Sequence, residues 1–154
     1  MPVVHDPMRL AERRTTVYPK ELAAGLEGRI KRVLTDPLGL TQFGVNLTTL
    51  EPGAMSSQRH WHETEDEFIY VLSGELTLVT KDGEQVLRTS MAAGFPKGDK
   101  NGHQLLNRGT VSATYLEVGT RSQDDDVTYP DIDMKGEKRD GRYRFFKKSG
   151  EPYT

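Results

Sequence analysis

Short segments that are rich in β-branched and aromatic residues alternate with turn residues along most of this chain, and this alternation limits the possible folds most strongly. Apolar and polar residues follow the two-residue period of β-strands in these segments. The predicted strands cover residues 29–34, 40–50, 67–72, 75–80, 84–88, 103–107 and 112–118. Lys81-Asp82-Gly83 predicts a hairpin turn. Many short strands with turns between them indicate an all-β sandwich or closed barrel.

The predicted strands divide the chain into three parts. Its 154 residues suit a single domain. We expect an N-terminal arm over residues 1–28, where Pro and Gly interrupt any long element, and a β-barrel over residues 29–120. We expect residues 121–154 to form a polar C-terminal tail with one short strand at 142–146, packed on the barrel or on a dimer partner.

Composition excludes several classes of site and partner. The chain has no cysteine, so disulfides and thiolate metal sites are excluded, and any metal must be bound by nitrogen and oxygen. The net charge of -2 provides no general attraction to nucleic acid or to an anionic membrane. No apolar run approaches the ~20 residues of a membrane span, and the N-terminus lacks a secretory pattern. We therefore expect a cytoplasmic protein that binds neither nucleic acid nor membrane.

Histidines concentrate in the middle of the chain. His60 and His62 are one residue apart, so on a strand both imidazoles would point to one face while Trp61 points to the other. An acidic run follows, which contains Glu63, Glu65, Asp66 and Glu67. Two imidazoles beside an oxygen ligand suit Zn, Mn, Fe, Ni or Cu. Taken alone, such a histidine pair also occurs among ordinary strand residues, and such an acidic run is also typical of a solvated loop.

The spacing around these histidines matches a known motif. Gly53 precedes His60 and His62, four residues separate His62 from Glu67, and six separate Glu67 from Gly74. This segment resembles the first motif of the cupin family. The resemblance implies that Glu67, rather than its acidic neighbours, is the carboxylate ligand. In the predicted strand, Glu67 shares one face with Ile69 and Val71.

A second segment resembles the second cupin motif. Pro96, Gly98, His103 and Asn107 match that motif in type and order, but four residues instead of two lie between Gly98 and His103. The resemblance to single-domain cupins covers residues 30–118. More narrowly, the chain resembles a group of short bacterial cupins that has no settled activity. It implies a cupin jelly-roll β-barrel in which His60, His62, Glu67 and His103 bind one divalent metal ion, Zn, Mn, Fe or Ni.

The implied ligand set points to a class of function. Four protein ligands leave one or two coordination positions open, which is typical of catalytic metals. We therefore expect a small-molecule ligand, and a metalloenzyme that acts on a sugar-like or carboxylate substrate as an isomerase or dioxygenase. The alternative is a non-catalytic cupin that binds or senses a small ligand and has a structural metal. Glu63, Glu65 and Tyr70 are the acid–base candidates, with metal-bound water as the alternative, and the sequence assigns no catalytic residue.

The strand that begins at Glu67 is apolar on both faces, because Phe68, Tyr70 and Leu72 occupy the face opposite Glu67. We expect the arm or the tail to cover these residues. The alternative cover is a homodimer interface. The two are compatible if the arms are exchanged between protomers, and we expect a homodimer. Candidate core or pocket residues are Phe43, Val45, Leu47, Phe95, Leu105, Leu116 and Val118. One of the pairs Tyr115/Glu117 and Leu116/Val118 should face the barrel interior. Arg59 is either a contact for an anionic substrate or a solvated loop residue.

Overall fold

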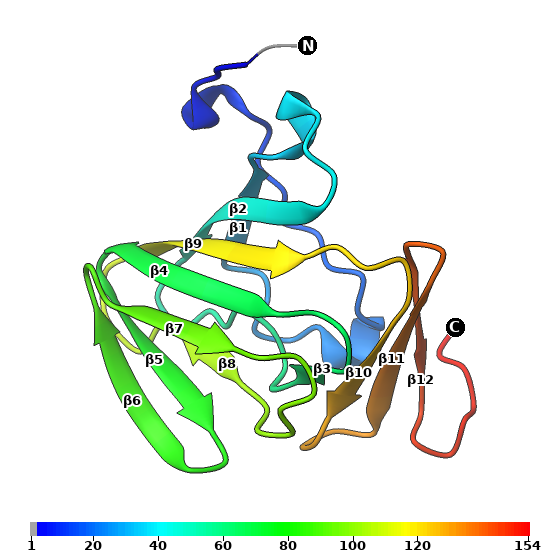
Figure 1. The fold of residues 1–154 in the computed structure, drawn as a ribbon. Coiled ribbons are helices and arrows are strands. Elements are labelled where there is room, and N and C mark those ends of the chain that lie inside the picture. The colour runs from blue at the N-terminus through cyan, green and yellow to red at the C-terminus, as the bar shows by residue number, and fades with distance from the viewer. Residues whose placement is uncertain (1–2) are drawn as a thin grey trace.

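The structure is a computed structural model that describes residues 3–154, and nearly all of its regular secondary structure consists of antiparallel strands (Figure 1). The strands are β1 (Arg29–Val33), β2 (Phe43–Leu50), β3 (Trp61–His62), β4 (Glu67–Ser73), β5 (Glu75–Thr80), β6 (Gly83–Arg88), β7 (Ala92–Phe95), β8 (Gln104–Leu106), β9 (Ala113–Thr120), β10 (Asp125–Tyr129), β11 (Met134–Arg139) and β12 (Arg142–Phe146). Three short 3-10 turns, Pro7–Arg9, Lys20–Leu22 and Asp36–Leu38, complete the regular structure. Within the described residues, no helix has the length and apolar character needed to cross a membrane.

The strands form two layers that enclose a barrel interior. One layer is a five-stranded sheet with the order β1-β2-β9-β4-β7. The other layer combines the sheets β6-β5-β8 and β12-β11-β10-β3, which meet where His60 and His103 form an antiparallel bridge. This arrangement confirms the predicted all-β barrel.

The tail is more regular than the sequence indicates. The strand expected at 142–146 is present as β12, and β10 and β11 precede it in the same sheet. Polar residues such as Asp126, Lys135 and Glu137 obscure the apolar alternation in β10 and β11, because one face of each strand is directed to solvent. The tail is therefore part of the second layer, since β10 pairs with β3.

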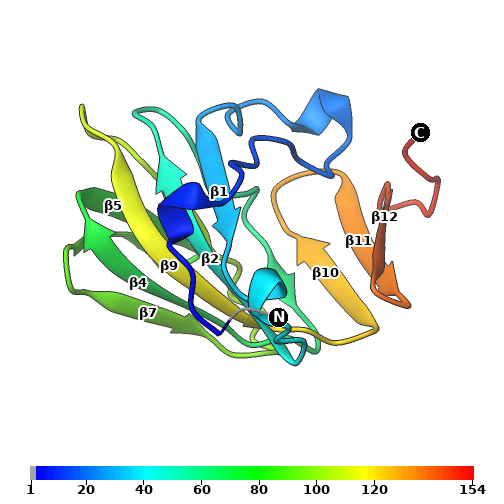
Figure 2. The ribbon, with the colours of Figure 1, turned by 90° about the horizontal axis from the view of Figure 1, so that it is seen from above.

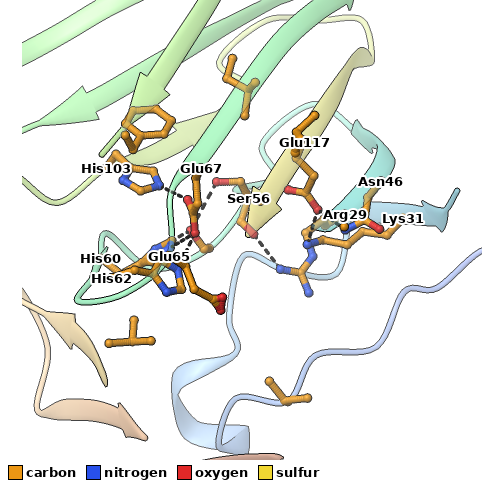
Figure 3. Close-up of a pocket in the computed structure, with 18 of the residues that line it drawn as sticks. Arg29, Lys31, Asn46, Ser56, His60, His62, Glu65, Glu67, His103 and Glu117 are labelled. Atoms are coloured by element: carbon orange, nitrogen blue, oxygen red, sulfur yellow. Dashed lines mark hydrogen bonds and ion pairs between the residues drawn. The ribbon is translucent and has the colours of Figure 1, made fainter. Parts of the chain in front are cut away.

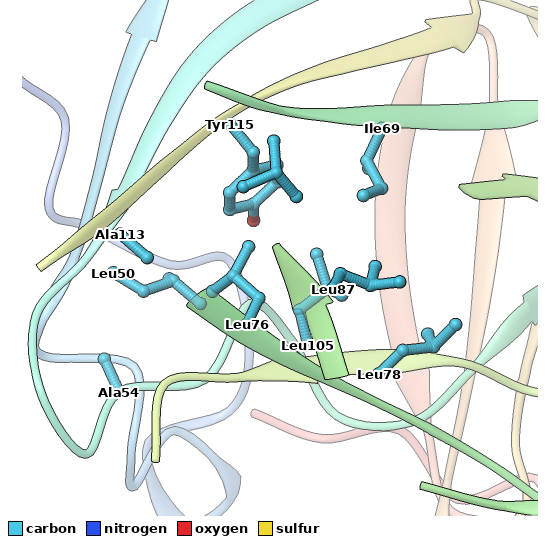
Figure 4. Close-up of a cluster of buried hydrophobic side chains, with 10 residues drawn as sticks. Leu50, Ala54, Ile69, Leu76, Leu78, Leu87, Leu105, Ala113 and Tyr115 are labelled. Carbon is cyan, nitrogen blue, oxygen red and sulfur yellow. The ribbon is translucent and has the colours of Figure 1, made fainter. Parts of the chain in front are cut away.

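Two apolar clusters stabilise the barrel. The main cluster lies between the two layers (Figure 4) and contains Leu50, Ala54, Ile69, Val71, Leu76, Leu78, Leu87, Leu105, Ala113 and Tyr115. The second cluster contains Val127, Tyr129, Met134 and Phe145 of the tail, and Tyr18 and Leu22 of the arm pack against it. The arm runs beside β1 and reaches the tail sheet (Figure 2), so the two ends of the chain pack on one another and on the barrel.

The outer face of the five-stranded sheet differs from the prediction. Phe68 and Leu72 are 43% and 40% exposed, so neither the arm nor the tail covers them, and the expectation of such a cover is wrong. A homodimer through this face stays a prediction.

The predicted core is also partly wrong. Leu105 is buried, Phe95 packs against the main cluster and Val118 lines the internal cavity, but Phe43 is exposed and Val45, Leu47 and Leu116 are only half-buried. The physical reason is strand parity, because Tyr115 occupies the inner face of β9 and its neighbour Leu116 the outer face.

Gly74 and Gly53, the two glycines of the first motif, both have positive φ but differ in their surroundings. At Gly74 (φ +77°) a Cβ atom would lie 2.9 Å from the backbone of Ser112 and Ala113, whereas at Gly53 (φ +84°) it would meet nothing within 4 Å. Gly53→Ala should lower the free energy of unfolding by about 1–2 kcal/mol through backbone strain alone. Gly74→Ala should lower it by about 2–5 kcal/mol, because a steric clash adds to the strain. Urea denaturation measures both, and equal losses would contradict this account.

Candidate functional site

His60 immediately precedes β3 and His62 is the last residue of this strand, and the backbone of His103 in the second motif pairs with that of His60. The amide of His60 donates to the carbonyl of His103 (3.1 Å), and the amide of His103 donates to the carbonyl of His60 (2.9 Å). The two motifs therefore meet through the backbone, and the imidazole centroids of His60 and His103 are 4.7 Å apart.

Glu67 approaches these histidines from the other layer. It is the first residue of β4 and points into the barrel, where its carboxylate meets all three imidazoles (Figure 3). Nε2 of His103 lies 2.5 Å from Oε2, Nε2 of His60 lies 3.4 Å from Oε1, and Nε2 of His62 also contacts Oε1. The structure thus brings the four predicted ligands together. Ligand atoms of His60, His62 and Glu67 lie within 4.8 Å of one another, and His103 joins them through Glu67.

The outer nitrogens of two of these rings are fixed by groups that accept hydrogen bonds. Nδ1 of His60 lies 2.8 Å from the carbonyl of Gln58, and Nδ1 of His62 lies 2.5 Å from Oδ2 of Asp125. A carbonyl and a carboxylate hold the ring proton on Nδ1, which leaves Nε2 as the atom that could bind a metal ion. The ring of His103 stacks on Phe95 with centroids 3.6 Å apart. These donors therefore fit a metal ion bound through three Nε2 atoms and a carboxylate.

Asp125 is a site residue that the sequence analysis did not find. Its side chain is fully buried, and Oδ1 accepts hydrogen bonds from the amide (2.9 Å) and the hydroxyl (2.8 Å) of Thr64. It lies in an acidic tail segment that resembles a solvated loop. Only the pairing of β10 with β3, in which Val127 is opposite His62, brings Asp125 to this ring.

Ionisation of the cluster follows from burial and hydrogen bonding. Burial alone would lower the pKa of His62, but hydrogen bonds to Asp125 and Glu67 raise it to about 10. Burial alone would raise the pKa of Glu67, but the surrounding imidazoles hold it well below its usual range. The pKa of Asp125 is likewise lowered, because hydrogen bonds from His62 and Thr64 outweigh its burial. Both carboxylates are therefore ionised, and they favour a positive charge, a proton or a metal cation, at this position.

The cluster opens into a cavity of about 570 Å³ inside the barrel. This volume falls within the range of about 300–1,000 Å³ that is typical of small-molecule sites. Among the acid–base candidates, Glu65 is buried and lines the cavity, Glu63 is exposed, and Tyr70 lies on the outer face of β4. Glu65 forms a buried ion pair with Lys138 of β11, with Nζ 2.6 Å from Oε1 and 3.2 Å from Oε2.

Arg59 does not line this cavity. Its guanidinium contacts both carboxylate oxygens of Asp131 at 2.7 and 2.8 Å, and it also donates to the carbonyl of Gly102. The solvated-loop interpretation is also incomplete, because these bonds attach the segment before His60 to the tail and to the loop before His103.

The two extra residues of the second motif do not displace His103. The loop is anchored near its start, where the amide of Gly98 donates to the carbonyl of His62 at 2.7 Å. Farther along, the Asn101 side chain donates to Asp82 at the tip of the β5–β6 hairpin (2.8 Å). The extra length thus extends toward the hairpin, while the backbone bridge to His60 fixes His103.

Comparison with known proteins identifies the family to which the chain belongs. The family model described as "Cupin domain" matches residues 46–119. A sugar phosphate isomerase from a cupin superfamily of Silicibacter pomeroyi is 44% identical, with 97% of this chain and 95% of that chain covered and a TM-score of 0.92. A proposed sugar phosphate isomerase of Acidithiobacillus ferrooxidans is 30% identical, with 80% of each chain covered and a TM-score of 0.74. No curated protein matches the chain.

A more distant structure shows the fold alone. The polyketide cyclase of Streptomyces resistomycificus is 21% identical, covers 78% of this chain and 79% of its own, and has a TM-score of 0.63. The fold is thus shared with a protein whose name describes other chemistry. On the identity and coverage of the Silicibacter protein, together with the matched domain, this chain belongs to the cupin superfamily.

Proposed function

We propose that this protein is a metal-dependent isomerase that interconverts the aldose and ketose forms of a small sugar-like substrate. One observation carries the proposal: the Nε2 atoms of His60, His62 and His103 meet the carboxylate of Glu67 at the wall of a small-molecule cavity. The names of the Silicibacter and Acidithiobacillus proteins support the same substrate class.

His60, His62, Glu67 and His103 would hold the metal. Imidazole nitrogen and carboxylate oxygen suit Zn, Mn, Fe and Ni, and the absence of cysteine excludes thiolate ligands. When bound, such a cation would act as a Lewis acid that stabilises negative charge on a substrate oxygen. Asp125 would orient the ring of His62 through the hydrogen bond to Nδ1.

Isomerisation also requires a group that moves a proton. A proton leaves the hydroxyl-bearing carbon next to the carbonyl, and a proton returns to the former carbonyl carbon, while the hydroxyl proton passes to the former carbonyl oxygen. Glu65 is favoured for this transfer over Glu63 and Tyr70, because it alone among the three lines the cavity. Lys138 holds the Glu65 carboxylate in place through their ion pair.

Metal content and turnover test the proposal together. Freshly purified protein should contain about one divalent metal ion per chain by elemental analysis, since His60, His62, Glu67 and His103 together would hold one ion. NMR spectroscopy should detect aldose–ketose interconversion with members of a sugar phosphate panel. His62→Ala should abolish both metal binding and turnover. Metal-free protein in every preparation, or turnover that persists in His62→Ala, would refute the proposal.

Asp125 should matter for metal affinity although it is not itself a ligand. Asp125→Asn removes the charged partner of His62 and should weaken metal binding by about 10–100-fold. Competition with a chromophoric chelator measures this change. Asp126→Asn is the matched control, because Asp126 is exposed and pairs with Arg139. Equal metal affinity of the two variants would show that the hydrogen bond to His62 has no effect on binding.

Glu65 and Glu63 form a second matched pair. Glu65→Gln should lower kcat by about 10²–10⁴-fold without loss of metal, because the amide cannot accept the substrate proton. Glu63→Gln, an exposed change two residues away, should leave kcat unaltered. Thermal denaturation shows whether Glu65→Gln still folds with Lys138 unpaired. A folded, metal-loaded Glu65→Gln variant with normal kcat would exclude Glu65 from proton transfer.

A further inference from the structure

A row of cations lies on the inner face of the sheet edge formed by the arm and β1. Arg29 and Lys31 are two residues apart on β1, so their side chains share one face. The arm forms an antiparallel bridge to β1, in which Arg13 is opposite Lys31 with N–O distances of 2.8 and 2.9 Å. Residues that are directly opposite one another share a face. Arg13, Arg29 and Lys31 accordingly all line the cavity, and Figure 3 shows Arg29 and Lys31 across it from Glu67.

The charges that line the cavity do not cancel. Lys31 pairs with Glu117 (2.6 Å), and Lys138 pairs with Glu65. Arg13 and Arg29 have no carboxylate within ion-pair distance anywhere in residues 3–154. This wall of the cavity therefore carries uncompensated positive charge, which favours an anionic ligand.

Arg29 is fixed in position without being neutralised. Its Nη1 donates to the carbonyl of Ser56 (2.7 Å), and its Nη2 donates to the carbonyl of Thr15 (3.4 Å). A guanidinium has five N–H donors, so these two bonds leave further donors available to a ligand. Both bonds orient the side chain before any ligand binds, which lowers the entropic cost of binding.

We propose that Arg13, Arg29 and Lys31 form a subsite for the phosphate monoester of the substrate, while the histidine cluster faces its sugar part. A phosphate monoester carries about -1.5 to -2 charges at neutral pH, which matches two unpaired arginines. Guanidinium groups also suit the geometry of phosphate oxygens. The sugar part of this assignment rests on the proposed function, but binding of the phosphate group does not.

Isothermal titration calorimetry with inorganic phosphate, ribose 5-phosphate and ribose tests the subsite on the intact, metal-loaded chain. Arg13→Gln is the main variant, because Arg13 is exposed and its side chain makes no hydrogen bond or ion pair within residues 3–154. It should weaken ribose 5-phosphate and phosphate binding by about tenfold, the value of one charged hydrogen bond, and should leave ribose binding unchanged. Arg29→Lys retains the charge but loses the guanidinium geometry and should weaken the same two probes.

Arg108→Gln is the matched control for loss of one positive charge, because Arg108 is exposed and pairs with Glu84 outside the cavity. It should leave the binding of all probes unchanged. Wild-type protein that binds neither phosphate nor ribose 5-phosphate would overturn the subsite. So would equal losses in Arg13→Gln and Arg108→Gln, or an Arg13→Gln variant that binds both phosphate probes normally.

The subsite and the proposed function can fail separately. Phosphate binding that depends on Arg13, in a protein without isomerase turnover, would support the subsite and refute the proposed function. Turnover that is lost in His62→Ala but unaffected by Arg13→Gln, together with equal affinity for ribose and ribose 5-phosphate, would support the proposed function and refute the subsite.

Discussion

The antiparallel bridge between His60 and His103 is the contact on which the rest of the site depends. It joins the two sheets of the second layer and places two imidazoles from distant parts of the chain with centroids 4.7 Å apart. Because backbone hydrogen bonds fix both residues, the two extra residues between Gly98 and His103 do not displace the ring of His103. Glu67 completes the cluster from the opposite layer, so the site is complete only where the two layers of the barrel face one another.

Burial of charge explains the surroundings of this cluster. A buried ionised group is stable only when it is paired and hydrogen-bonded. His62 lies between Glu67 and Asp125, and Glu65 is paired with Lys138. Both Asp125 and Lys138 come from the C-terminal sheet. The tail therefore contributes Lys138 to the cavity wall and Asp125 to the ring of His62. The first cupin motif is thus stabilised by residues that lie far from it in sequence.

The cavity wall has two chemically different parts. Imidazoles and a carboxylate suited to a metal occupy one part, and the cations of the arm and β1 occupy the other. A substrate that spans both would present a polar, oxygen-rich group to the first and an anionic group to the second. Such a division would give the common cupin barrel a substrate preference through an edge strand and an arm, since the fold alone does not select a reaction.

Much of the barrel and the four clustered side chains could be predicted from sequence, because strand alternation and motif spacing are local patterns. The two-residue period indicates where strands lie, and the spacing of His60, His62 and Glu67 identifies that group before any coordinates are known. The side of each strand that faces the interior was not determined, as Val45 and Leu47 show, because the inner face of β2 carries the polar residues Asn46 and Thr48 while the apolar Val45 and Leu47 lie on its outer face. The residues that the arm and the tail contribute around the cavity could not be predicted from sequence either. Asp125, Lys138 and Arg13 are ordinary charged residues in sequence. Only the pairing of β10 with β3 brings Asp125 to the ring of His62, and only the pairing of β11 with β10 and of the arm with β1 brings Lys138 and Arg13 to the cavity.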